Sequence, residues 1–169
     1  MGKVVFLWTN LNLKKAYHAL SYRPCPFEKT QLARHSQCRH AQQFRIADRS
    51  GLSCQSASAQ PRCQQLLKLL RHNARFTLQL SQIEGPLPHS KEIKVQTGGL
   101  RGLRNVLQNE KNEGIIEDIF TLLEQAITQF QELDNLPYEK FLAEINAVET
   151  RWRRRKKSKP KPDGDPPES

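Results

Sequence analysis

A cluster of glycines next to two arginines is the first part of this sequence whose residue types suit a binding chemistry. The segment "KEIKVQTGGLRGLRNVL", residues 91–107, alternates apolar and polar residues and then changes to the spacing of an amphipathic helix. Free backbone N–H groups at a helix start favour a phosphate, and glycine lets that phosphate approach closely. Arginine adds a planar fork that holds a phosphate through two hydrogen bonds. The candidate phosphate-binding residues are Gly98, Gly99, Arg101, Gly102 and Arg104.

A purely structural interpretation of the same residues stays open. Glycine also permits a positive φ at a sharp strand-to-helix turn, and the arginines would then be solvated surface residues. The segment lacks both the GK[ST] of a Walker loop and the GxGxxG of dinucleotide sites. The "GLRG" of residues 99–102 resembles the GxxG loop of KH-type RNA-binding domains, which implies contact with a nucleic-acid backbone. It departs from that family because a strand, not a helix, is expected to precede it.

A basic run near the end of the chain is the second candidate site. Eight of the eleven residues 151–161 are lysine or arginine. Such a run attracts any polyanion, whether RNA, DNA or an acidic membrane surface. A solubilising tail or a nuclear import address is the alternative. The residues predicted to contact phosphate are Arg151, Arg153, Arg154, Arg155, Lys156 and Lys157.

Four cysteines, Cys25, Cys38, Cys54 and Cys63, are the remaining residues with a distinctive chemistry. With the histidines of "HSQCRH" (35–40) they would suffice for a zinc site, but zinc sites usually show CxxC pairs, and none is present. We therefore predict no metal, no cofactor and reduced thiols. No nucleophile elbow, HExxH or paired-carboxylate motif occurs either, so we expect no enzyme.

The net charge of +10 is unevenly distributed along the 169 residues. Residues 1–60 hold nine Lys/Arg against two Asp/Glu, residues 61–150 hold ten against twelve, and residues 151–169 hold eight against three. No apolar run is long enough for a transmembrane helix or a signal peptide, because the longest near the start, "VVFLW", has five residues. We expect a cytoplasmic protein.

The elements that would position these residues begin at Pro61. The spacing predicts a helix from 61, alternating strands at 76–81 and 91–97 joined by a long loop, and helices at 99–109, 113–133 and 137–152. This is an α+β fold in which a small β-hairpin packs against about four helices in α-β-β-α-α-α order. The predicted domains are a basic, loosely ordered extension (1–60), the core (61–150) and a basic, then proline-rich, disordered tail (151–169).

Two functions remain compatible with this sequence. The first is a small non-enzymatic protein that binds the phosphate backbone of RNA or DNA, with RNA slightly favoured, through the glycine turn and the basic run. The second is a protein-interaction or regulatory module. Its docking or homodimer face would be the broad apolar stripe of the helix at 113–133.

Overall fold

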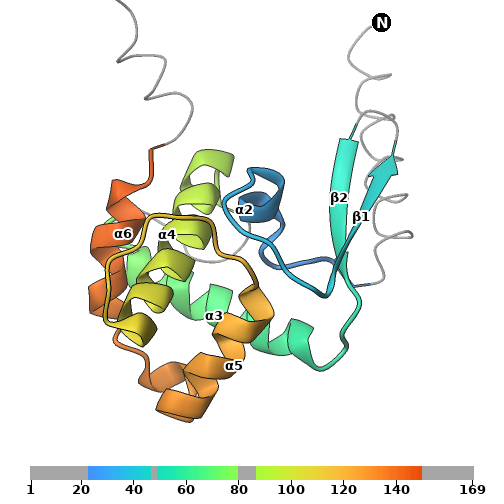
Figure 1. Cartoon of the computed structure of the whole chain (residues 1–169). Coiled ribbons are helices and arrows are strands. Elements are labelled where there is room, and N and C mark those ends of the chain that lie inside the picture. Colours follow the sequence, from blue (N-terminus) through green and yellow to red (C-terminus); the bar gives the residue numbers. More distant parts are fainter. Residues whose placement is uncertain (1–22, 47–48, 80–86, 150–169) are drawn as a thin grey trace, which may run out of the picture.

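A computed structural model describes residues 23–46, 49–79 and 87–149 of the chain (Figure 1). Most of the secondary structure is helical, and the two strands come early in the described chain. The elements are α2 (Glu28–Leu32), β1 (Ala41–Ile46), β2 (Arg49–Cys54), α3 (Ala59–Ala74), α4 (His89–Gln108), α5 (Ile119–Phe130), the short 3-10 helices η1 (Leu133–Asn135) and η2 (Tyr138–Lys140), and α6 (Phe141–Ala147).

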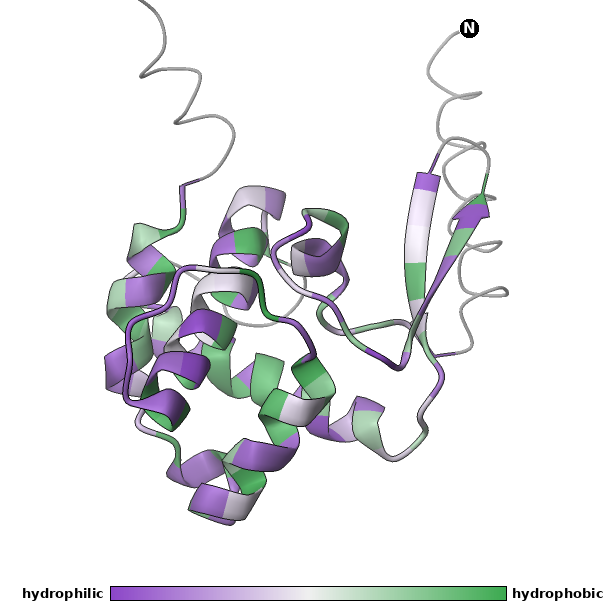
Figure 2. Cartoon of the chain, in the orientation of Figure 1, coloured by the Kyte–Doolittle hydropathy of each residue, from purple (hydrophilic) through white to green (hydrophobic). Residues whose placement is uncertain are grey.

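Helix α4 runs through the centre of the molecule and contacts α2, α3, α5 and α6. In Figure 1, α6 lies alongside α4 on the side away from the hairpin of β1 and β2. Figure 2 shows that the apolar faces of the helices turn toward one another. The most deeply buried large apolar side chains are Phe27, Leu66, Leu70, Leu100, Leu103, Ile119, Leu123, Phe141 and Ile145.

The hairpin confirms the predicted fold class but not the predicted strands. β1 and β2 pair antiparallel, with Ala41 opposite Cys54 at the base and Ile46 opposite Arg49 at the tip. This gives an α+β fold with a two-stranded hairpin among about four longer helices. The strand predicted at 76–81 is wrong as far as residue 79, because 75–79 form turns, and the strand predicted at 91–97 is helical.

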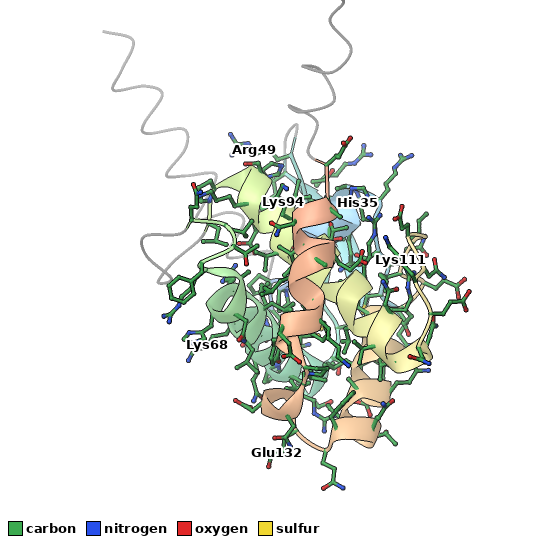
Figure 3. The ribbon with its side chains drawn as sticks, turned by 90° about the vertical axis from the view of Figure 1, so that its left-hand side faces the viewer. His35, Arg49, Lys68, Lys94, Lys111 and Glu132 are labelled. Carbon is green, nitrogen blue, oxygen red and sulfur yellow. The ribbon has the colours of Figure 1, made fainter. Side chains whose placement is uncertain are left out.

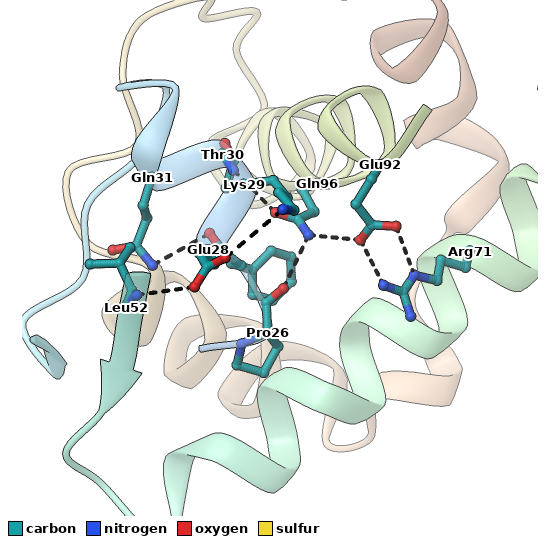
Figure 4. Close-up of polar contacts among 10 residues, drawn as sticks. Pro26, Glu28, Lys29, Thr30, Gln31, Leu52, Arg71, Glu92 and Gln96 are labelled. Atoms are coloured by element: carbon teal, nitrogen blue, oxygen red, sulfur yellow. Dashed lines mark hydrogen bonds and ion pairs between the residues drawn. The ribbon is translucent and has the colours of Figure 1, made fainter. Parts of the chain in front are cut away.

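Buried polar side chains explain why α4 resembles a strand in sequence. Glu92 and Gln96, one turn apart, both face the interior, and Glu92 is 4% exposed. Arg71 of α3 holds Glu92 through Nη2–Oε1 and Nε–Oε2 contacts of 2.7 and 3.2 Å (Figure 4). Because this inward face is polar, only Ile93 and Val95 remain to set the apolar pattern, and they alternate like a strand.

The same network fastens the segment before the hairpin to α4. Gln96 donates from Nε2 to Glu92 Oε1 at 2.7 Å and to the Pro26 carbonyl at 3.1 Å, and its Oε1 accepts from the Thr30 N–H at 3.1 Å. Glu28 accepts from the Leu52 N–H at 3.0 Å and so links α2 to β2 (Figure 4). These contacts join α2, α3, α4 and the hairpin into one body.

Residues 23–46 and 49–60 differ from the loosely ordered extension that we expected. They contain α2, both strands and the start of α3, and Phe27 and Thr30 are 1% and 0% exposed. Their partners lie far along the chain and are largely polar, so the segment shows no local periodicity. Residues 1–22 and the tail at 150–169 lie outside the described residues.

Two of the later helices are shorter than predicted. Helix α5 begins at Ile119 and not at 113, because Asp118 caps it by accepting a hydrogen bond from the Thr121 N–H at 3.3 Å. The helix expected from 137 is split into η2 and α6. Within the described residues, no helix combines the length and the hydropathy needed to cross a bilayer.

Candidate functional site

The glycine cluster is not a strand-to-helix turn, and this prediction is wrong. Gly98, Gly99 and Gly102 lie in the middle of α4, where backbone N–H groups bond to the preceding turn. A Cβ on Gly98 would stand 2.3 Å from the Ile145 Cα, and one on Gly102 would stand 2.8 Å from the Phe141 Cα. The glycines therefore allow α4 and α6 to approach closely. The similarity to a KH loop ends here, because "GLRG" is helix and not loop.

Arg104, the second predicted phosphate ligand of this segment, is committed to the chain itself. Its side chain is 6% exposed, and its guanidinium donates to the carbonyls of Gly114 (3.2 Å), Ile115 (3.1 Å) and Asn112. Burial, and then the nearby Arg101 guanidinium, lower the Arg104 pKa. Arg104 thus fixes the loop between α4 and α5, and this conformation leaves its inner face closed to a phosphate.

Arg101 and the basic run differ from Arg104 in what is known of their surroundings. Arg101 is half-buried, and its Nε has no hydrogen-bond partner among the described residues. The run of Arg151, Arg153, Arg154, Arg155, Lys156 and Lys157 lies outside the described residues, and its phosphate-binding role stays a prediction.

The apolar stripe at 113–133 is largely covered by the chain itself. Ile119, Leu122, Leu123 and Ala126 of α5 are buried. Ile115 is the large apolar side chain of this stretch that is exposed, at 54%. An open groove of about 620 Å³ runs past α5, but seven of its nine lining residues are polar or charged. The wide uncovered apolar face that a docking role requires is therefore not observed in this stretch.

The four cysteines, in contrast, meet at one place. Pro24 pairs with Ser53, so Cys25 lies opposite Leu52 and shares the face of the ribbon that carries Cys54. The Cys38 carbonyl accepts from the Ala41 N–H at 3.0 Å, and Ala41 is the strand partner of Cys54. Cys63 lies in the second turn of α3, which follows β2. Four separate segments therefore deliver one cysteine each to the base of the hairpin.

A small cavity of about 10 Å³ is lined by all four cysteines. The other lining residues are mostly apolar or small, and no carboxylate, lysine or arginine is among them. Cys54 and Cys63 are buried, and Cys25 and Cys38 are partly buried. The remaining lining residues are Pro26, Phe27, Gln31, His40, Ala41, Ala59, Ile119 and Phe120.

The cysteine side chains are protonated thiols in the free protein at neutral pH. Burial raises the pKa of Cys25 and of Cys63 to about 12, and it also raises that of Cys38. Cys25 Sγ accepts from Gln31 Nε2 at 3.1 Å, and the Cys54 thiol donates to the Ser56 carbonyl at 3.4 Å. As the described side chains lie, no three histidines, cysteines or carboxylates are grouped closely enough to hold one metal ion.

An ion pair holds the Cys38 turn against α5. Arg39 Nε lies 2.5 Å from Asp118 Oδ2, and the Arg39 N–H donates to Asp118 Oδ1 at 3.0 Å. Burial of the Asp118 carboxyl raises its pKa, but the hydrogen bonds from Arg39 and Thr121 outweigh burial and lower the pKa to about 2. His40, beside them, packs edge-on against Phe120 with ring centroids 4.5 Å apart.

The hairpin also carries the most basic surface among the described residues. Between Glu28 and Glu84 the sequence has one acidic residue, Asp48, against nine lysines and arginines. Arg34, Arg45 and Arg49 are exposed, and none forms a salt bridge with a described carboxylate. Register places Arg45 and Arg49 near the tip on opposite faces of the ribbon.

The two ends of the molecule therefore differ in charge. Figure 3 shows Arg49 at one end and Glu132 at the other. Residues 87–149 hold eleven Asp/Glu against six Lys/Arg, the reverse of the hairpin segment. A polyanion would be attracted to the hairpin end and repelled by the other.

Comparisons with known proteins assign no relative to this chain. No protein-family model, no curated protein and no solved structure matches it.

Proposed function

We propose that this chain is a small non-enzymatic protein that binds the phosphate backbone of a nucleic acid, with RNA as the favoured partner. The observation that carries the proposal is the hairpin, which stands at the edge of the helical body (Figure 1) and exposes Arg45 and Arg49 without a described carboxylate partner. The phosphate contacts are thereby assigned to the hairpin and not to the glycines of α4.

The shape and chemistry of the hairpin support this role. A two-stranded ribbon with a cation on each face can meet phosphates on both sides of a strand or groove. Gln42 and Gln43 are exposed along β1 and add neutral hydrogen-bonding groups to the same element. The acidic far end orients the molecule so that the hairpin meets the polyanion first. The basic run at 151–157 adds sequence-independent affinity in this proposal.

Fluorescence anisotropy with labelled single-stranded RNA across a salt series tests the proposal. The Arg45→Gln/Arg49→Gln variant should bind more weakly and should lower the slope of log K against log salt by about two, because each lost phosphate contact removes about one counterion. The matched control is Lys111→Gln/Lys140→Gln, which removes two exposed cations from the acidic half and should leave the slope unchanged.

A third variant separates the hairpin from the tail within the full-length chain. It changes Arg151, Arg153, Arg154, Arg155, Lys156 and Lys157 to glutamine. Residual binding that is still sensitive to Arg45→Gln/Arg49→Gln supports the hairpin. If the tail variant has no affinity at all, or if the hairpin variant binds like the wild type, the hairpin is not the nucleic-acid site.

A further inference from the structure

We propose that Cys25, Cys38, Cys54 and Cys63 together bind one thiophilic metal centre, a zinc ion or an iron–sulfur cluster, at the base of the hairpin. The inference rests on one juxtaposition: every cysteine of the 169-residue chain lines the same small cavity. It is independent of the proposed nucleic-acid binding, and either proposal stands if the other fails. It also reverses the prediction from the sequence, which found no metal site.

The convergence is difficult to explain by packing alone. Buried cysteine usually acts as a small apolar side chain, but alanine fills that role in the same cavity at Ala41 and Ala59. The cysteines are separated by 12, 15 and 8 intervening residues and come from four different segments. Only the tertiary fold brings them together, and it leaves no cysteine elsewhere. Four sulfur atoms from one chain are the ligand set that zinc and iron–sulfur clusters prefer.

The hairpin gains from a metal at this position. A two-stranded hairpin is marginally stable alone, and only Leu52 and Cys54 among its apolar side chains are buried. A metal at the cavity would join the segment before the hairpin, the turn into β1, the end of β2 and the start of α3. Such a cross-link is how small structures without a large core commonly hold an element in place.

The electrostatic surroundings suit a centre with four thiolates. Such a centre carries net negative charge, and no carboxylate lines the cavity to oppose it. Arg23 donates to the Cys54 carbonyl at 3.0 Å, and Arg39 directly follows Cys38. Each thiol releases its proton to solvent when its sulfur binds the metal.

The spacing of the thiols leaves two occupants with the same ligand chemistry. A zinc ion with four sulfurs at about 2.3 Å holds those sulfurs about 3.8 Å apart. The cysteines, as they lie, are not grouped closely enough for a single ion, so zinc requires the side chains to rotate inward. A cluster of several irons accepts more widely spaced sulfurs but needs more room than the small cavity offers, so the chain must relax around it. Metal analysis distinguishes the two occupants.

The first experiment uses full-length, untagged protein purified without oxygen. We would measure zinc, iron and acid-labile sulfide per chain, before and after reconstitution with Zn²⁺ or with Fe²⁺ and sulfide. We expect about one zinc with four sulfur neighbours by X-ray absorption, or iron with an equal amount of sulfide and the visible absorption of a cluster. The proposal is overturned if neither metal binds in a fixed ratio, or if zinc is bound through nitrogen or oxygen.

Substitutions then identify the ligands. We expect each of Cys25→Ser, Cys38→Ser, Cys54→Ser and Cys63→Ser to lose most of the bound metal. His40→Ala is the matched control, since His40 lines the same cavity and should not be a ligand. Full metal content in any folded serine variant, or its loss in His40→Ala, contradicts the four-cysteine centre. The sulfur count on the wild-type protein decides the question even if a variant does not fold.

Discussion

The glycine segment of α4 and the cysteines around the hairpin show opposite relations between sequence spacing and spatial arrangement. Gly98, Gly99 and Gly102 are close in sequence, but each touches a different neighbour: Ile145, Leu70 and Phe141. The cysteines are spread over 39 residues, but they line one cavity. A compact motif was therefore helix packing, and a dispersed set of residues became the stronger candidate site.

The difference follows from what each chemistry requires. A phosphate loop works only if the backbone N–H groups are free, and inside α4 they are already bonded. Thiol ligands have no such requirement, because any fold that brings four sulfurs together suffices. Sequence spacing is thus a good test for a site built from backbone and a poor test for one built from side chains.

Metal removal should separate the two regions most strongly. With a strong chelator under reducing conditions, we expect the amides of β2 to exchange hydrogen about a hundredfold faster or more, because structural thiolate sites contribute on the order of 10 kcal/mol. The amides of α4 should change little. Hydrogen exchange read by mass spectrometry measures both regions at once. Equal acceleration in α4 and β2, or no change in β2, would remove the distinction.

Gly98→Ala tests the packing role of the glycine segment. Its new Cβ would meet the Ile145 backbone at 2.3 Å, so α4 and α6 must separate, and we expect a loss of about 3 kcal/mol in the free energy of unfolding. The control is Gly114→Ala in the exposed loop, where the nearest atom is the Asn112 side chain. Urea denaturation compares the two. A Gly98→Ala protein as stable as the control would restore the prediction of a turn.

Arg104→Ala asks whether this arginine serves the fold or a ligand. It leaves the carbonyls of Asn112, Gly114 and Ile115 without their donor, and we expect a loss of about 2 kcal/mol in stability. RNA affinity and its salt slope should stay unchanged. Denaturation and anisotropy on the same preparation give both values. Reduced RNA affinity with unchanged stability would reverse the assignment.

Asp118→Asn should have the smallest effect, and its size should depend on pH. The folded pKa of Asp118, about 2, lies below the ordinary 3.8, so its contribution is present above about pH 4 and is lost as the pH falls toward 2. At neutral pH we expect a loss of about 1 kcal/mol, typical of a helix cap. Unfolding of both proteins at pH 7 and pH 2.5 checks this. A difference that persists unchanged at the lower pH contradicts it.

The sequence predicted the fold class because composition and helical spacing carry it. The burial of Leu66, Leu70, Ile119 and Leu123 follows directly from their periodicity. The strands were misplaced because the inward face of α4 is polar at Glu92 and Gln96, and because β1 and β2 alternate poorly. The cysteine cavity was out of reach because its members meet only through tertiary contacts.

The tie between Thr30 and α4 has a consequence for the order of folding. Thr30 bonds to Gln96 and Thr97, which are 66 and 67 residues away, whereas α4 meets α3 and α6 across shorter stretches of chain. Closing the longer loop is entropically less favourable, so we expect α3, α4 and α6 to assemble first. The segment carrying α2 then docks onto a surface already formed, and a polar surface of specific hydrogen-bond partners admits it in only one register.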